Sequence, residues 1–360
     1  MTSTLLAIGT HKGLFLATSD DRRSWTLDGP HFLMRDVYAV AIDRRRDPVR
    51  LLVGAASNHW GPSVSYSDDL GEHWHEPEKA PMAFPPDTDT ALAQVWQIQP
   101  AGPEQPDVVW AGSEPGSLWR STDGGVSYEL VRSLWDHPHR PQWEPGGGGQ
   151  CLHTILAGPG DRVLVAISTG GVYRSLDGGA SWAPSNQGIP MPGMPEPSPE
   201  FGQCVHKVAL DAGDPDRLYL QNHGGVFRSD NAGASWESIA DGLPADFGFP
   251  VVAHPRRADT AFVYPLEADM ARIPPDGNSR VYRTSDAGKS WEARGDGLPS
   301  EHAYGTVLRD AMTADDADPL GLYLGTRNGE VWASVDEGEH WDLVAGHLPD
   351  VLVLRAATIG

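Results

Sequence analysis

The sequence is poor in cysteine and in positive charge, and it has no long apolar run. Its two cysteines, Cys151 and Cys204, are too few for a disulfide framework and fit a reducing compartment. Its 27 basic residues are outnumbered by 49 acidic ones, so the formal charge of −22 would repel nucleic acids and anionic membrane surfaces. No apolar stretch approaches the ~20 residues that cross a membrane, and the first residues carry no basic segment typical of a signal peptide. We therefore expect a cytoplasmic protein with no nucleic-acid or membrane partner.

Turn-forming residues are abundant instead. The 360 residues include 41 Gly and 31 Pro, together one residue in five. This proportion is high for a globular chain but too low for a low-complexity one. Many short strands joined by turns fit this composition better than long helices.

One pattern, Ser/Thr-x-Asp-x-Gly-x-x-Trp, recurs seven times at intervals of 49 to 55 residues. Short Ser and Asp side chains bind backbone amides in tight turns, and Gly supplies a positive φ, so we interpret the motif as a structural turn. Four intact copies begin at Ser67, Ser175, Thr284 and Ser334. The three degenerate copies are Ser121-Asp123-Gly125-Tyr128, Ser229-Asn231-Gly233-Trp236 and Thr18-Asp20-Arg22-Trp25.

Between the copies, short apolar runs alternate with turns, which predicts four strands per repeat with the motif between the third and the fourth. Four-stranded repeats of this length are typical of β-propeller blades. Six repeats lie between Trp25 and Trp341, and the segments outside them add up to about one more, which makes seven. We therefore predict an all-β fold, a seven-bladed β-propeller forming a single domain over residues 1–360. Its ring would close by pairing residues 351–354 with residues 5–8 and 13–16.

At one end of the predicted blades the connections are long and rich in aromatic, histidine and charged residues, so we expect the functional site there. Residues 136–149 end in four glycines, Gly146 to Gly149, which indicate a hinge or a close backbone approach. Residues 265–277 insert charged side chains where other repeats have a tight turn. The Pro- and Met-rich residues 189–197 form either a stiff crossover or a pocket rim.

The sequence Gly-Gln-Cys-x-His occurs twice, at 149–153 and 202–206, each time at the start of a predicted innermost strand. Imidazole and thiolate are ligands of zinc and similar transition metals. The candidate metal ligands are His153, His206, His223 and His59. Polar ligand contacts without a metal, or purely structural histidines, are the alternatives, and no other cofactor is expected.

Acid–base chemistry has its own candidates. Two carboxylates with different pKa values are the minimum required for glycoside hydrolysis. The candidate catalytic carboxylates are Glu267, Asp269 and Asp310. The candidate substrate contacts are Tyr38, Trp96, Trp143, Asn222, Arg272, Arg309 and Arg327, of which the three arginines could clamp a substrate carboxylate.

The repeated motif looks like the Asp-box, or bacterial neuraminidase repeat, of β-propellers. Over nearly its full length the chain resembles bacterial single-domain seven-bladed proteins described as sialidase-like glycosyl hydrolases or as relatives of a plant photosystem II stability/assembly factor. Besides the boxes, the resemblance rests on Trp143 with Gly146–Gly149, Gln221-Asn222-His223, Gly242-Leu243-Pro244, Phe247-Gly248-Phe249 and Val307-Leu308-Arg309-Asp310-Ala311-Met312. It implies an Asp-box propeller fold.

Two functions remain open at this point. The first is an enzyme with a pocket at the mouth of the propeller channel, which acts on a small polar, carbohydrate-like substrate by hydrolytic, acid–base or metal-assisted chemistry. The second is a non-catalytic propeller that binds a protein partner or helps to assemble a complex.

Overall fold

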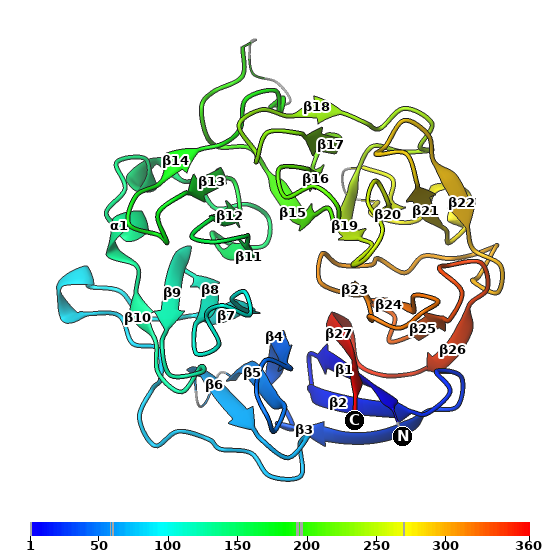
Figure 1. Cartoon of the computed structure of the whole chain (residues 1–360), viewed down its shortest axis with the longest axis horizontal. Coiled ribbons are helices and arrows are strands. Elements are labelled where there is room, and N and C mark those ends of the chain that lie inside the picture. Colours follow the sequence, from blue (N-terminus) through cyan, green and yellow to red (C-terminus); the bar gives the residue numbers. More distant parts are fainter. Residues whose placement is uncertain (1, 58, 60, 192–193, 195–196, 269–270) are drawn as a thin grey trace. The chain divides into compact units, whose positions relative to one another are not determined.

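The computed structural model describes residues 1–360 apart from residues 1, 58, 60, 192–193, 195–196 and 269–270. The fold is nearly all-β, and its seven sheets are the blades of a seven-bladed β-propeller (Figure 1), which confirms the predicted fold class. Contacts divide the chain into two compact units. The first comprises Met1–Leu33, Gly188–Pro192 and His206–Gly360, and the second Met34–Gln187 and Gly193–Val205. The single domain over residues 1–360 stays a prediction, and part of the Pro- and Met-rich stretch lies outside the described residues.

The first unit holds four sheets of four strands each. One sheet has the order β27-β1-β2-β3, and the others run in chain order from β15, β19 and β23. The strands are β1 Ser3–Thr10, β2 Gly13–Ser19, β3 Thr26–His31, β15 Val205–Leu210, β16 Leu218–Asn222, β17 Gly225–Ser229, β18 Glu237–Ser238, β19 Gly248–Ala253, β20 Ala261–Pro265, β21 Val281–Thr284, β22 Glu292–Arg294, β23 Met312–Ala314, β24 Leu322–Gly325, β25 Val331–Ser334, β26 Asp342–Ala345 and β27 Val351–Ile359. A short 3-10 helix, η3 Pro275–Gly277, lies between β20 and β21.

The second unit holds three sheets, beginning at β4, β7 and β11. Its strands are β4 Asp36–Asp43, β5 Arg50–Ser57, β6 Gly61–Ser67, β7 Gln94–Pro100, β8 Val109–Glu114, β9 Ser117–Ser121, β10 Glu129–Leu130, β11 Leu152–Ala157, β12 Val163–Ile167, β13 Gly171–Ser175 and β14 Ala183–Pro184. Its helices are η1 Pro86–Thr88, α1 Arg132–Trp135 and η2 Arg140–Gln142. Among the described residues, none of the helices is long and apolar enough to span a membrane.

Four strands per repeat is wrong for the blade of β4, β5 and β6, which has three. The expected fourth strand around His75 is reduced to an isolated bridge, in which Tyr66 and His75 exchange backbone hydrogen bonds of 2.8 and 3.3 Å. The His75 ring stacks on the Tyr66 ring, with 4.6 Å between centroids. At this position one backbone bridge and the stacked rings of Tyr66 and His75 replace the expected fourth strand.

The two ends of the chain share one sheet, as the sequence predicted. β27 pairs antiparallel with β1 from Ser3↔Ile359 to Thr10↔Val351, and β1 pairs with β2. Val351, Leu352, Val353 and Leu354 are all at most 3% exposed. β27 therefore supplies both backbone pairing and buried apolar surface to a sheet that otherwise comes from the first residues of the chain.

Deletion of residues 350–360 should abolish the cooperative melting transition seen by calorimetry. The deletion leaves the β1 edge unpaired and exposes the core that β27 covers. The milder variant Leu354→Ala should retain a transition while losing roughly 2–5 kcal/mol of unfolding free energy. A native-like melting curve for the deleted protein would contradict this account of closure.

The repeated motif forms one hydrogen-bonded turn. In the copy after β13, the Ser175 hydroxyl donates to Asp177 Oδ1 at 2.7 Å and accepts from the Gly179 amide at 2.8 Å. Asp177 Oδ1 also accepts from the Ser181 amide at 2.9 Å. Gly179 has a φ of +89°, a conformation that favours glycine. The turn is thus held by local side-chain-to-backbone bonds, as the sequence predicted.

The first copy is shifted by one residue from the predicted position. The structure places the turn at Ser19 and Asp21, with the Ser19 hydroxyl donating to Asp21 Oδ1 at 3.0 Å, and not at Thr18 and Asp20. The amides of Arg23 and Ser24 donate to the same carboxylate oxygen. Alignment on Trp25 caused the error, because this copy has one residue fewer between its Asp and its Trp.

The motif tryptophans join neighbouring sheets within each unit. The Trp291 indole N–H donates to the Ile239 carbonyl at 2.8 Å, which links the turn after β21 to the preceding blade. In the second unit Trp182 packs in one apolar cluster with Trp110 of β8. The motif therefore fastens a hairpin and also fills the space between blades.

The motif carboxylates should make stability fall in acid. Hydrogen bonds, chiefly from the Ser181 hydroxyl, hold the pKa of Asp177 at about 2, and bonds led by the His73 amide do the same for Asp69. A lowered folded-state pKa gives stability that is present above the ordinary carboxyl pKa and is lost as pH falls from about 4 towards 2. Urea unfolding measured between pH 5 and pH 2.5 should show a smaller loss for Asp177→Asn than for the natural sequence.

Asn231 provides the matched control. It occupies the carboxylate position of its own copy and accepts from the Ser235 amide at 2.9 Å, so Asn is compatible with the turn. Asn231→Asp should steepen the same acid-dependent loss. Equal slopes for all three proteins would contradict a role for these carboxylates.

Candidate functional site

Three predicted site residues lie at the same irregularity in their strands. In β4, β7 and β11 the register with the next strand skips one residue, which is Tyr38, Trp96 or His153. Such β-bulges re-aim a side chain and are frequent beside functional sites. A bulge interrupts the period-two alternation of side chains along a strand, so these three side chains depart from the pattern of their neighbours.

Tyr38 and Trp96 form an aromatic pair in the second unit. Their ring centroids are 4.6 Å apart at an interplanar angle of 49°, and both residues are half-buried. The Trp96 indole N–H donates to Glu114 Oε2 at 3.1 Å, from the end of the neighbouring strand β8. The pair therefore presents aromatic surface beside a carboxylate.

The glycine-rich segment comes close to this carboxylate. Gly146 and Gly149 exchange backbone hydrogen bonds, and Gly149 has a φ of +93°. A Cβ at position 149 would lie 2.2 Å from Glu114 Oε1. Of the two roles proposed for the four glycines, the structure therefore supports the close backbone approach.

Of the other predicted site residues of the second unit, Trp143 and His153 are buried and His59 is exposed. Trp143 is 7% exposed, and its indole N–H donates to the Tyr173 hydroxyl at 2.9 Å, which favours a packing role. His153 is 1% exposed, with Nδ1 3.1 Å from Thr154 Oγ1. His59 is exposed between β5 and β6.

In the first unit, His206 and His223 lie against two phenylalanines. The imidazole centroids are 5.7 Å apart, and His206 lies 4.7 Å from the Phe249 ring. His206 Nδ1 is 2.6 Å from the Gly248 carbonyl, so this nitrogen carries the proton and Nε2 is left as an acceptor. Burial lowers the pKa of His206 to about 3, and Arg309, His223 and Arg272 lower it further, so His206 is neutral near pH 7.

Arg272 and Arg309 extend over the same phenylalanine. Their guanidinium carbons lie 5.6 and 5.9 Å from the Phe249 ring centroid. Arg272 is exposed and Arg309 is half-buried. The structure therefore brings together four predicted site residues: His206, His223, Arg272 and Arg309.

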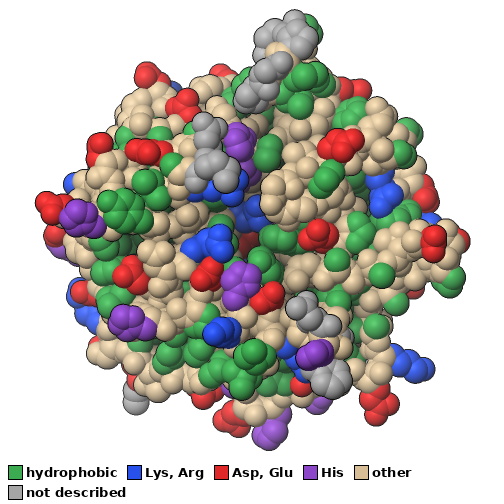
Figure 2. All heavy atoms as spheres, turned by 180° about the vertical axis from the view of Figure 1, so that it is seen from behind, with side chains coloured by type: hydrophobic (Ala, Val, Ile, Leu, Met, Phe, Trp, Pro, Cys, Tyr) green, Lys and Arg blue, Asp and Glu red, His purple; other side chains and the backbone are tan. Residues whose placement is uncertain are grey.

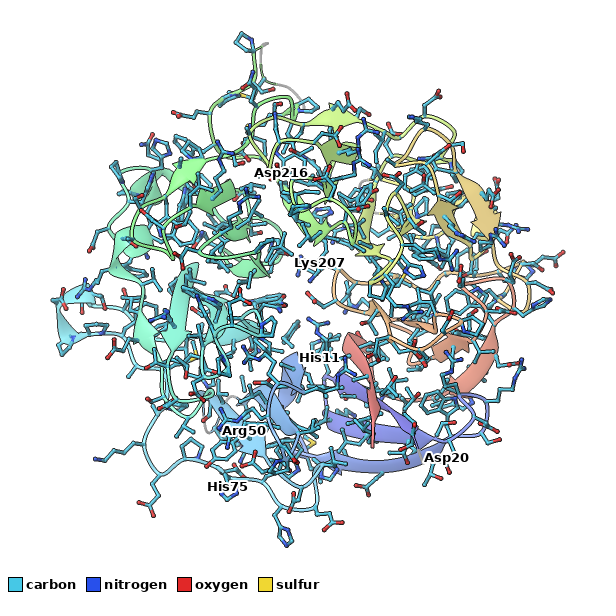
Figure 3. All side chains as sticks on the ribbon, in the orientation of Figure 1. His11, Asp20, Arg50, His75, Lys207 and Asp216 are labelled. Carbon is cyan, nitrogen blue, oxygen red and sulfur yellow. The ribbon has the colours of Figure 1, made fainter. Side chains whose placement is uncertain are left out.

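Asp310 is engaged by two cations. Its Oδ1 accepts from Lys207 Nζ at 2.8 Å and from Arg355 at 2.5 Å, and the residue is 4% exposed. Lys207 extends from the innermost strand β15 (Figure 3). Burial raises the pKa of Asp310, but the charges and hydrogen bonds of Lys207 and Arg355 outweigh it and bring the pKa well below the usual range. Asp310 therefore stays ionised and is unsuited to the role of general acid.

The other predicted site residues of the first unit are Glu267, Asp269, Arg327 and Asn222. Glu267 is exposed in the β20–β21 connection, and Asp269 lies outside the described residues. Arg327 is paired with Asp350 at 2.8 Å. Asn222 is 1% exposed and accepts from the Gly224 amide at 2.9 Å, which shapes the turn before β17.

Part of the predicted metal site is brought together. His206 and His223, two of the predicted ligands, lie together in the first unit, with their ring centroids 5.7 Å apart. His153 and His59 belong to the second unit, so the four-histidine set stays a prediction. On the face seen in Figure 2, histidines lie among basic and acidic side chains.

Sequence reasoning missed Lys207 and Arg355 and did not pair Glu114 with Trp96. Lys207 directly follows His206, but its partner Asp310 is 103 residues away along the chain. Arg355 faces the same carboxylate only because β27 returns to the first unit's inner edge. Neither contact has a local sequence signal.

The protein is a β-propeller in which each unit holds a cluster of polar and aromatic side chains. Comparisons with known proteins show what the chain is similar to. No family model matches the sequence. The chain is similar to the xyloglucanase of Hypocrea jecorina, with 26% identity over 313 residues, which are 78% of this chain and 35% of that protein. It therefore spans about a third of the length of that relative.

Solved structures show the same fold at lower identity. The GH74 enzyme of Niastella koreensis is 14% identical, with a TM-score of 0.60 over 94% of this chain and 54% of that chain. YCF48 from Cyanidioschyzon merolae is also 14% identical, with a TM-score of 0.52 over 86% of this chain and 84% of that one. At such identities the likeness concerns the fold alone.

Asp310→Asn should destabilise the protein by roughly 3–5 kcal/mol, because it leaves two cations beside a neutral side chain. Urea unfolding at pH 7 measures the loss. The double variant Lys207→Met/Asp310→Asn should recover part of it, since one unpaired charge is removed. An unchanged unfolding midpoint for Asp310→Asn would show that the three charges do not stabilise the fold.

Proposed function

We propose that the protein binds a carbohydrate and hydrolyses it. The observation that carries this proposal is the Tyr38–Trp96 pair with Glu114 at its edge. The alignment of 78% of the chain with a xyloglucanase supports it independently. The substrate class is therefore an oligosaccharide or polysaccharide.

The chemistry of the pair suits a sugar ring. Aromatic faces pack against the apolar C–H face of a sugar, while carboxylates accept hydrogen bonds from its hydroxyls. The Trp96–Glu114 hydrogen bond fixes both partners before a ligand arrives, which reduces the entropy lost on binding.

Hydrolysis needs a carboxylic acid with a raised pKa and a second carboxylate. Asp310 cannot supply the acid, because its two cationic partners keep it ionised. Glu267, on the exposed connection, and Asp269 remain our proposed catalytic carboxylates. Metal assistance through His206 and His223 also remains a proposal.

A protein-binding propeller is the second candidate function. The observation in its favour is the exposure of two large apolar side chains in the β3–β4 connection, Leu33 at 65% and Met34 at 70%. Exposed apolar residues of this size mark docking surfaces when they lie together.

Calorimetric titration with xyloglucan and cello-oligosaccharides tests the carbohydrate proposal. Trp96→Ala should weaken binding about tenfold or more, because stacking surface and the Glu114 contact are both lost. Trp96→Phe keeps an aromatic ring but not the indole N–H, so it should weaken glycan binding less than Trp96→Ala does.

Release of reducing ends from the same glycans separates an enzyme from a binding protein. Cleavage that is lost in Glu267→Gln with binding retained would support hydrolysis. Binding without cleavage would leave a carbohydrate-binding propeller. If no glycan binds at millimolar concentration, the protein-binding alternative takes its place.

A further inference from the structure

A pocket lies between two neighbouring blades of the second unit, β7–β10 and β11–β14 (Figure 1). Its empty volume is about 360 Å³, part of which is open to solvent, and its walls come from the β7–β8 turn, β8, β9, the β11–β12 turn and the motif turn after β13. Trp96 is the third residue of β7, whereas the pocket begins at Ala101, directly after the last residue of that strand. The pocket is therefore separate from the Tyr38–Trp96 pair.

One blade earlier, the equivalent place is filled by an arginine. Arg50 pairs with Asp68 Oδ1 at 2.7 Å and donates to the Gly124 carbonyl at 3.1 Å. When the repeats are aligned on the motif serine, Val108 and Thr122 take the places of Arg50 and Asp68 in the next blade. The ion pair that closes the space between the first two blades therefore has no counterpart between the next two.

Three polar groups at this pocket have no partner among the described residues. The Gly178 carbonyl, which corresponds to the Gly124 carbonyl, accepts no hydrogen bond, and the exposed Asp161 carboxylate forms no hydrogen bond or ion pair. The Arg120 guanidinium lies 5.6 Å from the Trp110 ring centroid and makes no other side-chain contact of these kinds. The pocket thus offers a cation, an anion and a backbone acceptor.

The equivalent arginine of another repeat is paired. Arg228 precedes its motif serine as Arg120 does, and it pairs with Asp230 at 3.0 Å. Thr122 stands where Asp230 does, so Arg120 lacks that partner. Glu129 lies opposite Arg120 in the β9–β10 ladder, but the two side chains form no ion pair in the part of the chain that the structure describes. A half-buried charge without a partner costs free energy, which a bound counter-charge would recover.

We propose that this pocket binds a small zwitterion with one ammonium and one carboxylate group, such as a free amino acid. Arg120 binds the carboxylate, for which its planar donors are suited. The ammonium group donates to the Asp161 carboxylate and to the Gly178 carbonyl. Trp110, which is 2% exposed, supplies the apolar wall beside Arg120.

A ligand with a single charge suits the pocket less well. An anion alone would lie near Asp161 and a cation alone near Arg120, and in each case the like charge opposes binding. A zwitterion compensates both charges at once. All the residues that carry this inference belong to the second unit, and it does not rest on the proposed binding of a carbohydrate.

Calorimetric titration of the full chain at low salt tests the assignment. The probes are glycine, β-alanine and γ-aminobutyrate, in which the two charges lie progressively further apart. Acetate and methylammonium are the controls with one charge each. At least one zwitterion should bind at millimolar concentration and more tightly than either control, and the tightest of the three identifies the spacing that the pocket accepts. Raising the ionic strength should weaken binding.

Arg120→Gln and Asp161→Asn should each weaken the tightest zwitterion about tenfold or more, because each removes one charged partner. Lys79→Gln removes a charge from an exposed connection of the same unit and should leave the affinity unchanged. Melting curves check that each variant is folded. Arg120→Gln should also leave any binding of glycans unchanged, which separates this site from the proposed carbohydrate site.

The double variant Val108→Arg/Thr122→Asp rebuilds the pair that Arg50 and Asp68 form one blade earlier. Its new guanidinium should donate to the Gly178 carbonyl, fill the pocket and abolish zwitterion binding while the melting transition is retained. If this variant does not fold, the two single variants still decide the proposal.

Three outcomes would overturn the inference. The first is the absence of binding by all three zwitterions at millimolar concentration. The second is equal affinity in Arg120→Gln and Lys79→Gln. The third is binding of acetate or methylammonium as tight as that of every zwitterion, since the second charge would then contribute nothing.

Discussion

The pairing of β27 with β1 is the contact on which the rest of the first unit depends. It joins the two ends of the chain in one sheet and buries Val351 to Leu354. It also positions chemistry, because the Leu354 amide donates to the Asp310 carbonyl at 2.7 Å while Arg355 reaches the Asp310 carboxylate. One strand therefore completes the sheet and supplies a cation to the charged cluster. A defect in closure would therefore disturb the stability of the sheet and the contacts of Asp310 together.

The bulges explain how regular repeats carry different side chains. Tyr38, Trp96 and His153 occupy the skipped position of three equivalent strands, so one backbone irregularity is used for a phenol, an indole and an imidazole. A bulge bends the strand and turns its extra side chain out of the alternation that fills the core. The repeat can then keep its buried pattern while the bulged residue varies. The fold by itself does not specify a function, so the bulged positions and the connections beside them are where propellers of this kind can differ.

The repeat spacing was enough to predict the fold class, the position of the motif turns and the closure by residues 351–354. Those features follow from local signals, namely Gly, Asp and apolar runs at fixed intervals. The first motif was placed one residue early because one residue fewer separates Asp21 from Trp25 than separates Asp from Trp in the other copies. The charged cluster could not be predicted as a set, since Lys207, Asp310 and Arg355 come from distant strands. Asp310 was proposed as a catalytic carboxylate from its residue type, and its catalytic role stays a prediction. Its protonation state depends on Lys207 and Arg355, neighbours that only the fold reveals.

The charged cluster of Lys207, Asp310 and Arg355 also lowers the stability of the fold. Taking charges out of water costs several kcal/mol per ion, and even a well-paired buried salt bridge rarely returns more than that. Here Lys207 and Arg355 both bind the carboxylate of Asp310. Apolar side chains of similar volume would fill these positions at lower cost, as Val351 and Val353 do in β27, the strand that also carries Arg355. The apolar burial of Val351 to Leu354 in the same strand as Arg355 therefore has to offset part of the free energy that these charges cost.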